Sequence, residues 1–324
     1  MRARQLFLVV ALTAAVLVPG PAVRADLNYR AEITGAEDSD LADLLDKVSE
    51  LKTLEDRPPA SEEALRRRAE RDLGRLADAA RSLGYWAAEF SYDIDTQADP
   101  AKVTVTVKPG PLYHVASVMV LGPDGQPLSM PLGEQKLPLK PGDPARTAPV
   151  VATETALVAA FGETGHPFAK VENRRVEIDH GTQTMDVTYT LDPGPVMRFG
   201  PPAVEGLERL DPAYVEGRIR WQRGEVYDAS KVEETRRALI ESGLFSTVQI
   251  TPTADPDNPE DVRMTIDATE RLHRTIGVGL AYNTSQGAGA RAFWENRNLF
   301  GNAEYLKLAA EVGQQIDAFR ANFR

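Results

Sequence analysis

The residue types that most often carry out chemistry stand apart from one another in this chain. Its four histidines occur singly, with no His-Glu-x-x-His pair and with no cysteine to serve as a second ligand: His114, His166, His180 and His273. A zinc site needs several such ligands at short, regular spacings. The carboxylates are numerous but scattered, so no pair is predicted to share a pocket. The sequence therefore predicts no catalytic residue and no metal site.

A glycine-rich run at residues 287–292 matches the letters of a dinucleotide-binding fingerprint, Gly-Ala-Gly-Ala-Arg-Ala. That fingerprint binds a cofactor only where it follows a strand and opens a helix. Here the surrounding residues predict a further strand. The chain also lacks the Gly-x-x-x-x-Gly-Lys pattern of a phosphate-binding loop. We therefore predict no cofactor and a chain that is not an enzyme.

The first 25 residues have the pattern of a secretory signal peptide. Arg2 and Arg4 precede an uncharged apolar run over residues 6–18, and small residues stand before a cleavage point after Ala25. The alternative is an uncleaved membrane anchor, but 13 residues are short for a bilayer-spanning helix. The mature chain is therefore expected outside the cytoplasm, and without cysteines its domains depend on their hydrophobic cores.

The mature chain is strongly acidic. Removal of the three arginines in the signal peptide takes the formal net charge from −11 to −14, with 34 basic against 48 acidic residues. Nucleic acid binding requires a basic surface, so nucleic acid is not an expected partner. We interpret the acidity as a contribution to solubility.

One pattern occurs three times along the chain. An apolar run ends at a glycine (Gly35, Gly122 and Gly206), and a helical stretch then ends at a second glycine (Gly84, Gly165 and Gly243). Two strands follow, and the second alternates strictly, as in Val103, Val105 and Val107. The first glycine recurs after 87 and 84 residues and the second after 81 and 78. Repetition at a nearly fixed period predicts three like α+β modules.

Composition and turn signals set the predicted boundaries of these modules. They are expected at residues 26–110, 111–194 and 195–271, followed by a different region at 272–324. Ser230 with Glu233 three residues later predicts a capping box at the start of a helix in the third module.

The region after residue 271 changes to strands of about ten residues. Ile276, Val278 and Leu280 share one face of the first strand, whereas Gly277 and Gly279 take the other. Strands that are apolar on one face and small or polar on the other are typical of a transmembrane β-barrel. A soluble β domain shows the same alternation, so that alternative stays open.

Together these features resemble the outer-membrane insertase superfamily, whose periplasmic modules are POTRA domains. The three glycine-ended strands, the three helix-ending glycines and the turn at residues 294–302 carry the resemblance. It implies an α+β chain of three tandem POTRA (β-α-α-β-β) domains followed by the first strands of a transmembrane antiparallel β-barrel. Three modules resemble TamA-type autotransporter assembly factors more than BamA-type proteins, with five, or two-partner secretion pores, with two. Since family barrels have about sixteen strands, the chain is expected to be the truncated front of a longer protein.

The resemblance also implies a function, a location and partners. The chain is expected in the bacterial outer membrane with its POTRA domains in the periplasm, where it promotes insertion of autotransporters or other β-barrel proteins. Expected partners are unfolded outer-membrane protein clients, a TamB-like periplasmic protein and outer-membrane lipid. One alternative is a two-partner-type secretion pore, although no plug helix precedes the first module. A soluble periplasmic scaffold is another.

The candidate binding site is the edge of a sheet, because an extended client segment can pair with unpaired backbone groups there. The middle strand of each module is the expected edge, at 86–94, 168–178 and 246–253. Its candidate residues are Trp86, Phe90, Tyr92, Phe168, Val171 and Val248. These strands could equally be ordinary solvated hairpin strands. A second candidate is a barrel seam strand at Ile276, Gly277, Val278, Gly279 and Leu280, where glycines without packing side chains would weaken pairing.

Overall fold

The computed structural model describes residues 27–131, 137–256, 258–283, 287–313 and 317–324. The predicted signal peptide therefore lies outside the described residues. The chain divides into two units, Met1–Leu112 and Tyr113–Arg324. Among the described residues, no helix is both long enough and apolar enough to cross a membrane.

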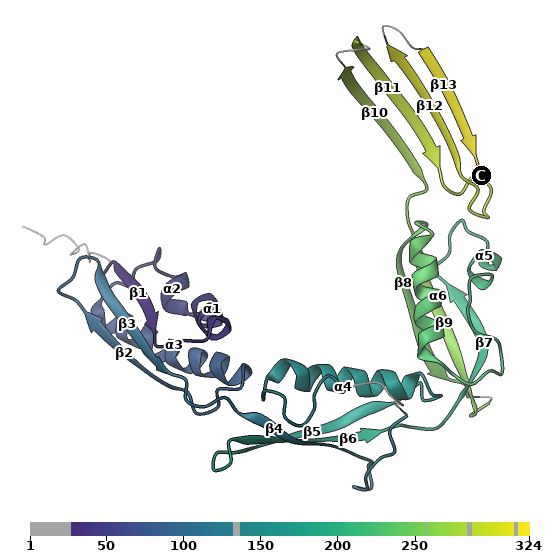
Figure 1. Cartoon of the computed structure of the whole chain (residues 1–324). Helices are drawn as coiled ribbons and strands as arrows, with labels where there is room; N and C mark the ends of the chain where they lie inside the picture. The colour runs from purple at the N-terminus through teal and green to yellow at the C-terminus, as the bar shows by residue number, and fades with distance from the viewer. Residues whose placement is uncertain (1–26, 132–136, 257, 284–286, 314–316) are drawn as a thin grey trace, which may run out of the picture. The chain divides into compact units, whose positions relative to one another are not determined.

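The first module packs its helices on one face of a three-stranded sheet (Figure 1). Its elements in chain order are β1 (Tyr29–Thr34), α1 (Ser39–Val48), α2 (Glu50–Thr53), α3 (Glu62–Ser82), β2 (Glu89–Asp95) and β3 (Ala101–Lys108). The strand order is β1-β3-β2, with β1 parallel and β2 antiparallel to the central β3. Alternate residues of β3 are buried, as its sequence predicted.

The long helix α3 supplies most of the helical part of this core. Ser61 caps its first turn, and Leu65, Leu76 and Ala80 on its inner face are fully buried. It also buries Asp72, whose carboxylate accepts hydrogen bonds from Ser49 Oγ, Glu50 N and Leu51 N. This carboxylate holds the start of α2 and so stabilises the break between α1 and α2 at Ser49.

The second and third modules repeat the same sheet. The second contains β4 (His114–Leu121), α4 (Thr147–Gly162), β5 (Lys170–Asp179) and β6 (Thr184–Asp192). The third contains β7 (Arg198–Glu205), α5 (Pro212–Glu216), α6 (Ala229–Glu241), β8 (Phe245–Ala254) and β9 (Asp261–Glu270). Their strand orders, β4-β6-β5 and β7-β9-β8, match that of the first module. Within the described residues of the second module there is one helix.

The helix-ending glycines predicted from the repeat all adopt the same backbone conformation. Gly84, Gly165 and Gly243 follow α3, α4 and α6 with φ of +99°, +106° and +72°. Residues with a side chain rarely adopt this conformation. The predicted capping box of α6 is wrong, because Asp228 is the N-cap and accepts a hydrogen bond from the Ser230 backbone N–H.

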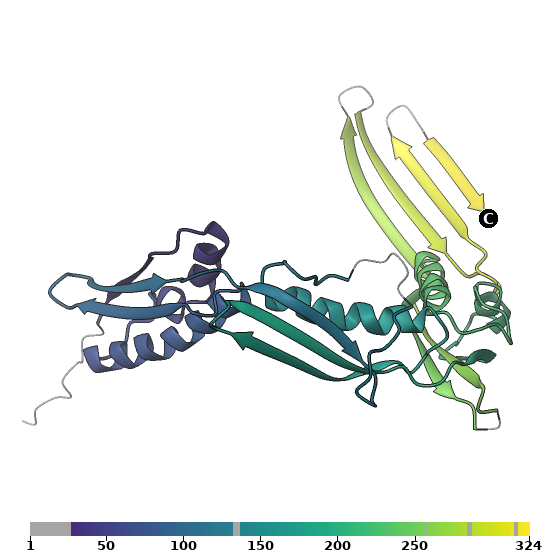
Figure 2. The same ribbon diagram turned by 60° about the horizontal axis from the view of Figure 1, so that its bottom comes forward.

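The chain ends in a four-stranded antiparallel sheet, called the C-terminal sheet below (Figure 2). Its strands lie in chain order: β10 (Arg274–Asn283), β11 (Gly287–Asn296), β12 (Leu306–Gly313) and β13 (Asp317–Phe323). Among the described residues this sheet does not close on itself, so β10 and β13 are both edges.

Candidate functional site

Each module has one sheet edge that is covered by the chain itself. On β1, the Ala31 N–H donates to the Glu55 carboxylate over 2.7 Å. On β4, Val115 pairs its backbone with residues 142 and 143. On β7, the Phe199 backbone pairs with residues 224 and 225, and two prolines follow at 201 and 202. Proline has no N–H to offer, so β7 in particular is a poor template for another strand.

The second strand of each module is the open edge. β2, β5 and β8 each pair with the central strand on one side only. Among the described residues, no loop of the chain forms a backbone hydrogen bond with their outer sides. Pro252 removes one donor from β8. The structure thus places the open edge on the strands where the sequence predicted it, and provides three such edges.

The aromatic residues predicted beside these edges are not part of an exposed surface. Trp86 and Phe168 lie in turns before β2 and β5 rather than in the strands. Phe90 and Tyr92 do lie in β2, but both are half-buried against the core of the first module. Tyr92 Oη donates to Glu70 on α3 over 3.2 Å, so its ring belongs to the helix-covered face.

The other predicted edge residues also point inward. Phe168 packs against the core of the third module, which also contains the buried Val248. Val171 lies in β5 opposite Leu191 and is half-buried. Phe90, Tyr92, Phe168 and Val248 are therefore packing residues, so what the edges mainly offer to a partner is their backbone.

The C-terminal sheet has two different faces, as its sequence predicted. One face, called the apolar face below, exposes Ile276, Val278, Leu280 and Tyr282 by between 77% and 90%. The large side chains of β12 and β13 that continue it are also exposed: Val312, Phe319 and Phe323. Such an area of apolar surface on water-exposed strands requires a partner, whether lipid or protein.

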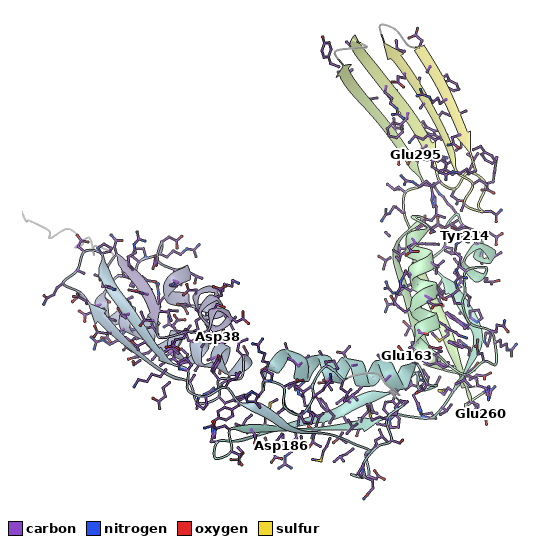
Figure 3. All side chains as sticks on the ribbon, viewed as in Figure 1. Asp38, Glu163, Asp186, Tyr214, Glu260 and Glu295 are labelled. Atoms are coloured by element: carbon purple, nitrogen blue, oxygen red, sulfur yellow. The ribbon has the colours of Figure 1, made fainter. Side chains whose placement is uncertain are left out.

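The opposite face carries the ion pairs of the sheet. Glu295 is buried among Arg297, Lys307 and the Tyr305 hydroxyl at the end of the sheet nearest the third module (Figure 3). Arg320 and Glu311 form a further ion pair on β13 and β12, 2.9 Å apart. Because ion pairs occupy one face and apolar side chains the other, the sheet separates a polar from an apolar environment.

The predicted seam strand β10 is an edge of this sheet, but its two glycines differ. A Cβ at Gly277 would lie 2.2 Å from the Phe293 ring, because Phe293 is its partner on β11 and covers it. The prediction that Gly277 leaves the pairing unpacked is therefore wrong. A Cβ at Gly279 would meet nothing within 4 Å, so that position is open.

A carboxylate that the sequence did not point to lies at the end of the third module, next to the start of the C-terminal sheet. Glu270 Oε1 accepts hydrogen bonds from three successive backbone N–H groups, those of Glu208, Arg209 and Leu210, each over 2.9 Å. Its Oε2 accepts from His273 Nε2 over 2.8 Å. Burial opposes ionisation of Glu270, but the hydrogen bonds from the Arg209 N–H, His273 and the other two N–H groups outweigh it. They hold the pKa of Glu270 at about 2.

The turn between β11 and β12 completes this junction. Asn298 Nδ2 donates to the Arg209 carbonyl over 3.3 Å, and the Asp211 N–H donates to the Gly301 carbonyl over 3.0 Å. Ala303 packs against the core of the third module. Within the described part of the chain, no group of His, Cys, Asp or Glu is arranged to hold a metal ion.

Comparison with known proteins gives a family match for the second and third modules. Residues 134–194 and 198–271 match the family described as "POTRA: Surface antigen variable number repeat". The chain is 25% identical to "Outer membrane protein assembly factor BamA" of Nitratidesulfovibrio vulgaris over 264 residues, which are 78% of this chain and 32% of that protein. It is 24% identical to the BamA of Neorickettsia risticii over 247 residues, 74% of this chain and 32% of that protein.

A solved structure shows the same fold. It is the crystal structure of BamA from Haemophilus ducreyi lacking POTRA domains 1–3, with a TM-score of 0.56 and 18% identity. The match covers 65% of this chain and 39% of that one. The chain spans about a third of the length of the curated relatives it matches.

The family match agrees with the predicted POTRA domains over the second and third modules, and the mixed α+β fold and the similarity to BamA are confirmed. BamA homologues are outer-membrane proteins with periplasmic POTRA domains, which agrees with the predicted location. The relatives are named as assembly factors, which supports the prediction that the chain is not an enzyme.

Proposed function

We propose that this chain is an assembly factor for outer-membrane β-barrel proteins. The observation that carries the proposal is the combination of three open edges, β2, β5 and β8, with a C-terminal sheet that exposes one apolar face. The modules lie in the periplasm and receive unfolded clients, whereas the C-terminal sheet lies in the outer membrane as part of a barrel wall. The names of the BamA relatives support both parts.

The open edges act through their backbones. An unfolded client segment in extended conformation adds to β2, β5 or β8 as a fourth strand and pairs with their free N–H and C=O groups. Main-chain pairing tolerates many sequences, which suits a receptor for varied clients. This pairing requires no covalent chemistry.

The edges can be tested one at a time because the chain has no cysteine of its own. Single cysteines on exposed positions of the open strands are compared with matched cysteines on the covered strands. The open-strand variants are Ser91→Cys, Asn173→Cys and Gln249→Cys, and the controls are Arg30→Cys, Met119→Cys and Glu205→Cys. A urea-unfolded outer-membrane protein with one cysteine in a membrane strand is then added. Disulfide trapping is expected at the open strands, and equal trapping at the controls would refute the assignment.

The first strand of the C-terminal sheet has the second role. β10 is an edge whose outer side can pair with a client strand, and Gly279 lies at an unpacked position on it. Val278→Pro removes a backbone donor in the middle of β10. We expect this variant to abolish client insertion into vesicles while trapping at the open strands of the modules persists. Wild-type insertion by Val278→Pro would show that β10 is not the receiving strand.

The apolar face argues against a soluble periplasmic scaffold. Ile276, Val278 and Leu280 are all more exposed than a stable soluble domain tolerates for neighbouring large side chains. A monodisperse chain in buffer without detergent would favour the scaffold instead.

The finer assignment, to autotransporter clients and a TamB-like partner, rests on the presence of three modules. It is tested by co-purification of the chain with the TamB-like protein of the same organism. Failure to bind would remove this part and leave the assembly role intact.

A further inference from the structure

A cleft lies where the C-terminal sheet meets the third module, and it is called the junction cleft below. It encloses about 340 Å³. Its polar lining residues come from the third module, β10 and the β11 end: Arg209, His273, Arg274, Asn296 and Asn298. Among the described residues that line it, none is a carboxylate. In a chain with a net charge of −11, this is a local concentration of positive charge.

Two arginines give the junction cleft its charge. The side chains of Arg209 and Arg274 are exposed and form no ion pair or hydrogen bond with any described residue. The nearby Glu270 carboxylate does not neutralise them through direct pairing, because three backbone N–H groups and His273 occupy it. The guanidinium groups of Arg209 and Arg274 therefore remain available to donate hydrogen bonds to an anion.

Arg274 lies next to the apolar face, so an anion bound there could belong to a membrane surface. Arg274 pairs with Asn296 in the β10–β11 ladder, and the next residues on the same face are Ile276 and Trp294. Side chains two residues apart in a strand point to the same side. Arg274, and with it the junction cleft, therefore lies at the base of the apolar face, where a membrane surface would begin.

Exposed apolar side chains flank this boundary. Leu272 is 86% exposed and Phe300, which lines the junction cleft, is 76% exposed. Large apolar and aromatic side chains beside arginines are typical of the membrane–water interface. Arginine can keep its charge in the headgroup layer while its aliphatic stem lies along apolar surface.

The apolar face contains a trough above the junction cleft. Its floor is made of small side chains, Ala290, Ala292 and Ala310, and its walls include Val278, Leu280 and Val312. Ala292 and Ala290 lie four and six residues from Asn296 along β11, which corresponds to roughly 13–20 Å. Half of a bilayer's hydrocarbon core is about 15 Å. The trough therefore lies at acyl-chain depth if the arginines lie among headgroups.

We propose that the junction cleft binds the phosphate of a glycerophospholipid from the leaflet that faces the third module, with one acyl chain of that lipid in the alanine trough. The proposal rests on the proposed function, because it requires the C-terminal sheet to lie in a membrane. It adds a lipid site with named donors, Arg209 and Arg274, to that placement. A bound lipid would bridge the third module and β10 on the face opposite the ion pairs of Glu295.

The headgroup part is tested by vesicle flotation with the full chain. Vesicles of phosphatidylcholine alone are compared with vesicles that also contain phosphatidylglycerol. The variant is Arg209→Gln/Arg274→Gln, and the control is Arg66→Gln/Arg67→Gln, which removes the same charge from exposed pairs on α3. Each arginine near an anionic surface contributes about fivefold in binding, so the double variant should lose roughly 25-fold of the preference for phosphatidylglycerol.

The outcomes separate the site from the proposed function. Equal loss in the control pair, or an unchanged preference in Arg209→Gln/Arg274→Gln, would overturn the headgroup site while leaving membrane insertion standing. Binding of no vesicle by the wild-type chain would overturn the membrane placement and the site with it. We expect every variant to keep binding vesicles of phosphatidylcholine. Only Arg209→Gln/Arg274→Gln should lose the preference for phosphatidylglycerol.

The acyl-chain part has its own variant. Ala292→Phe fills the trough, whereas Ala321→Phe puts the same ring on the same face outside it. Mass spectrometry of the chain purified in detergent with phosphatidylglycerol should show retained lipid for wild type and Ala321→Phe. It should show none for Ala292→Phe, with Trp294 fluorescence in a Trp86→Phe/Trp221→Phe background confirming that the sheet is folded. Equal retention by both variants would contradict the trough.

Discussion

Replacement of Glu270 by glutamine tests the junction between the third module and the C-terminal sheet. The side chain is 6% exposed, and it accepts from three successive backbone N–H groups and from His273. Glutamine keeps the shape and one acceptor oxygen but loses the charge. The bonds to residues 208–210 then become neutral, and the second oxygen is replaced by an amide that cannot accept from His273.

The size of the effect follows from the pKa. A pKa held at about 2 instead of the usual 4.5 means that the folded state stabilises the ionised carboxyl. At 1.36 kcal/mol for each pH unit, this amounts to about 3 kcal/mol. Neutral hydrogen bonds are roughly half as strong as charge-assisted ones. Glu270→Gln should therefore destabilise the junction by about 1.5 kcal/mol, and Glu270→Ala by the full amount or more.

Hydrogen exchange at the three amides measures this directly. Their exchange at pH 7 should become about tenfold faster in Glu270→Gln. Since the folded pKa lies below the unfolded one, the stabilisation is present above pH 4.5 and is lost as the pH falls toward 2. The difference between wild type and variant should shrink over that window. Glu208→Gln, an exposed neighbour, is the control. Equal exchange in wild type and Glu270→Gln at pH 7 would refute the reasoning.

Three further substitutions test other parts of the fold. Asp72→Ala leaves two buried donors and one half-buried donor in the first module without their acceptor and should cost about 3 kcal/mol. Its urea unfolding is followed by Trp86 fluorescence in a Trp221→Phe/Trp294→Phe background, and an unchanged midpoint would contradict the role of Asp72. Gly84→Ala places a side chain on a residue with a φ of +99° and should lower the stability of the first module by about 1–2 kcal/mol in the same assay. The control is Gly74→Ala on α3, which has open space around it and should not destabilise the module. Phe293→Ala uncovers Gly277 and removes the ring that Lys307 Nζ approaches to 4.6 Å. Exchange of the β10 amides in detergent should become faster by an amount equivalent to about 1 kcal/mol, and unchanged exchange would show that the ring does not hold β10.

Features that depend only on residues close together in the sequence could be predicted. The alternation of Val103, Val105 and Val107 predicted a buried strand face, and all three are at most 2% exposed. The helix-ending glycines were identified by their spacing, because a left-handed residue after a helix is a local requirement. The two faces of β10 followed in the same way from a period of two.

Features that depend on pairing between distant segments could not be predicted. Phe90 and Tyr92 face the helices because of how β2 pairs with Val105 and Val107, and a one-residue shift would have turned them to solvent. Asp228 and Ser230 are both good capping residues, so their types alone could not decide between them. The three amides that bind Glu270 lie about 60 residues away in the chain, and no local pattern connects them.

A protein that leaves three strand edges open must also avoid pairing with other copies of itself. The outward side chains of β2 suggest how the first module does this. Glu89, Asp93 and Asp95 are exposed along one edge strand. Two copies that met edge to edge would bring these carboxylates together, and inward or edge charges are a known defence against such association. An unfolded client without this charge pattern meets no such repulsion. If the proposed function holds, the same acidic strand would accept foreign chains while keeping neighbouring copies of this protein apart.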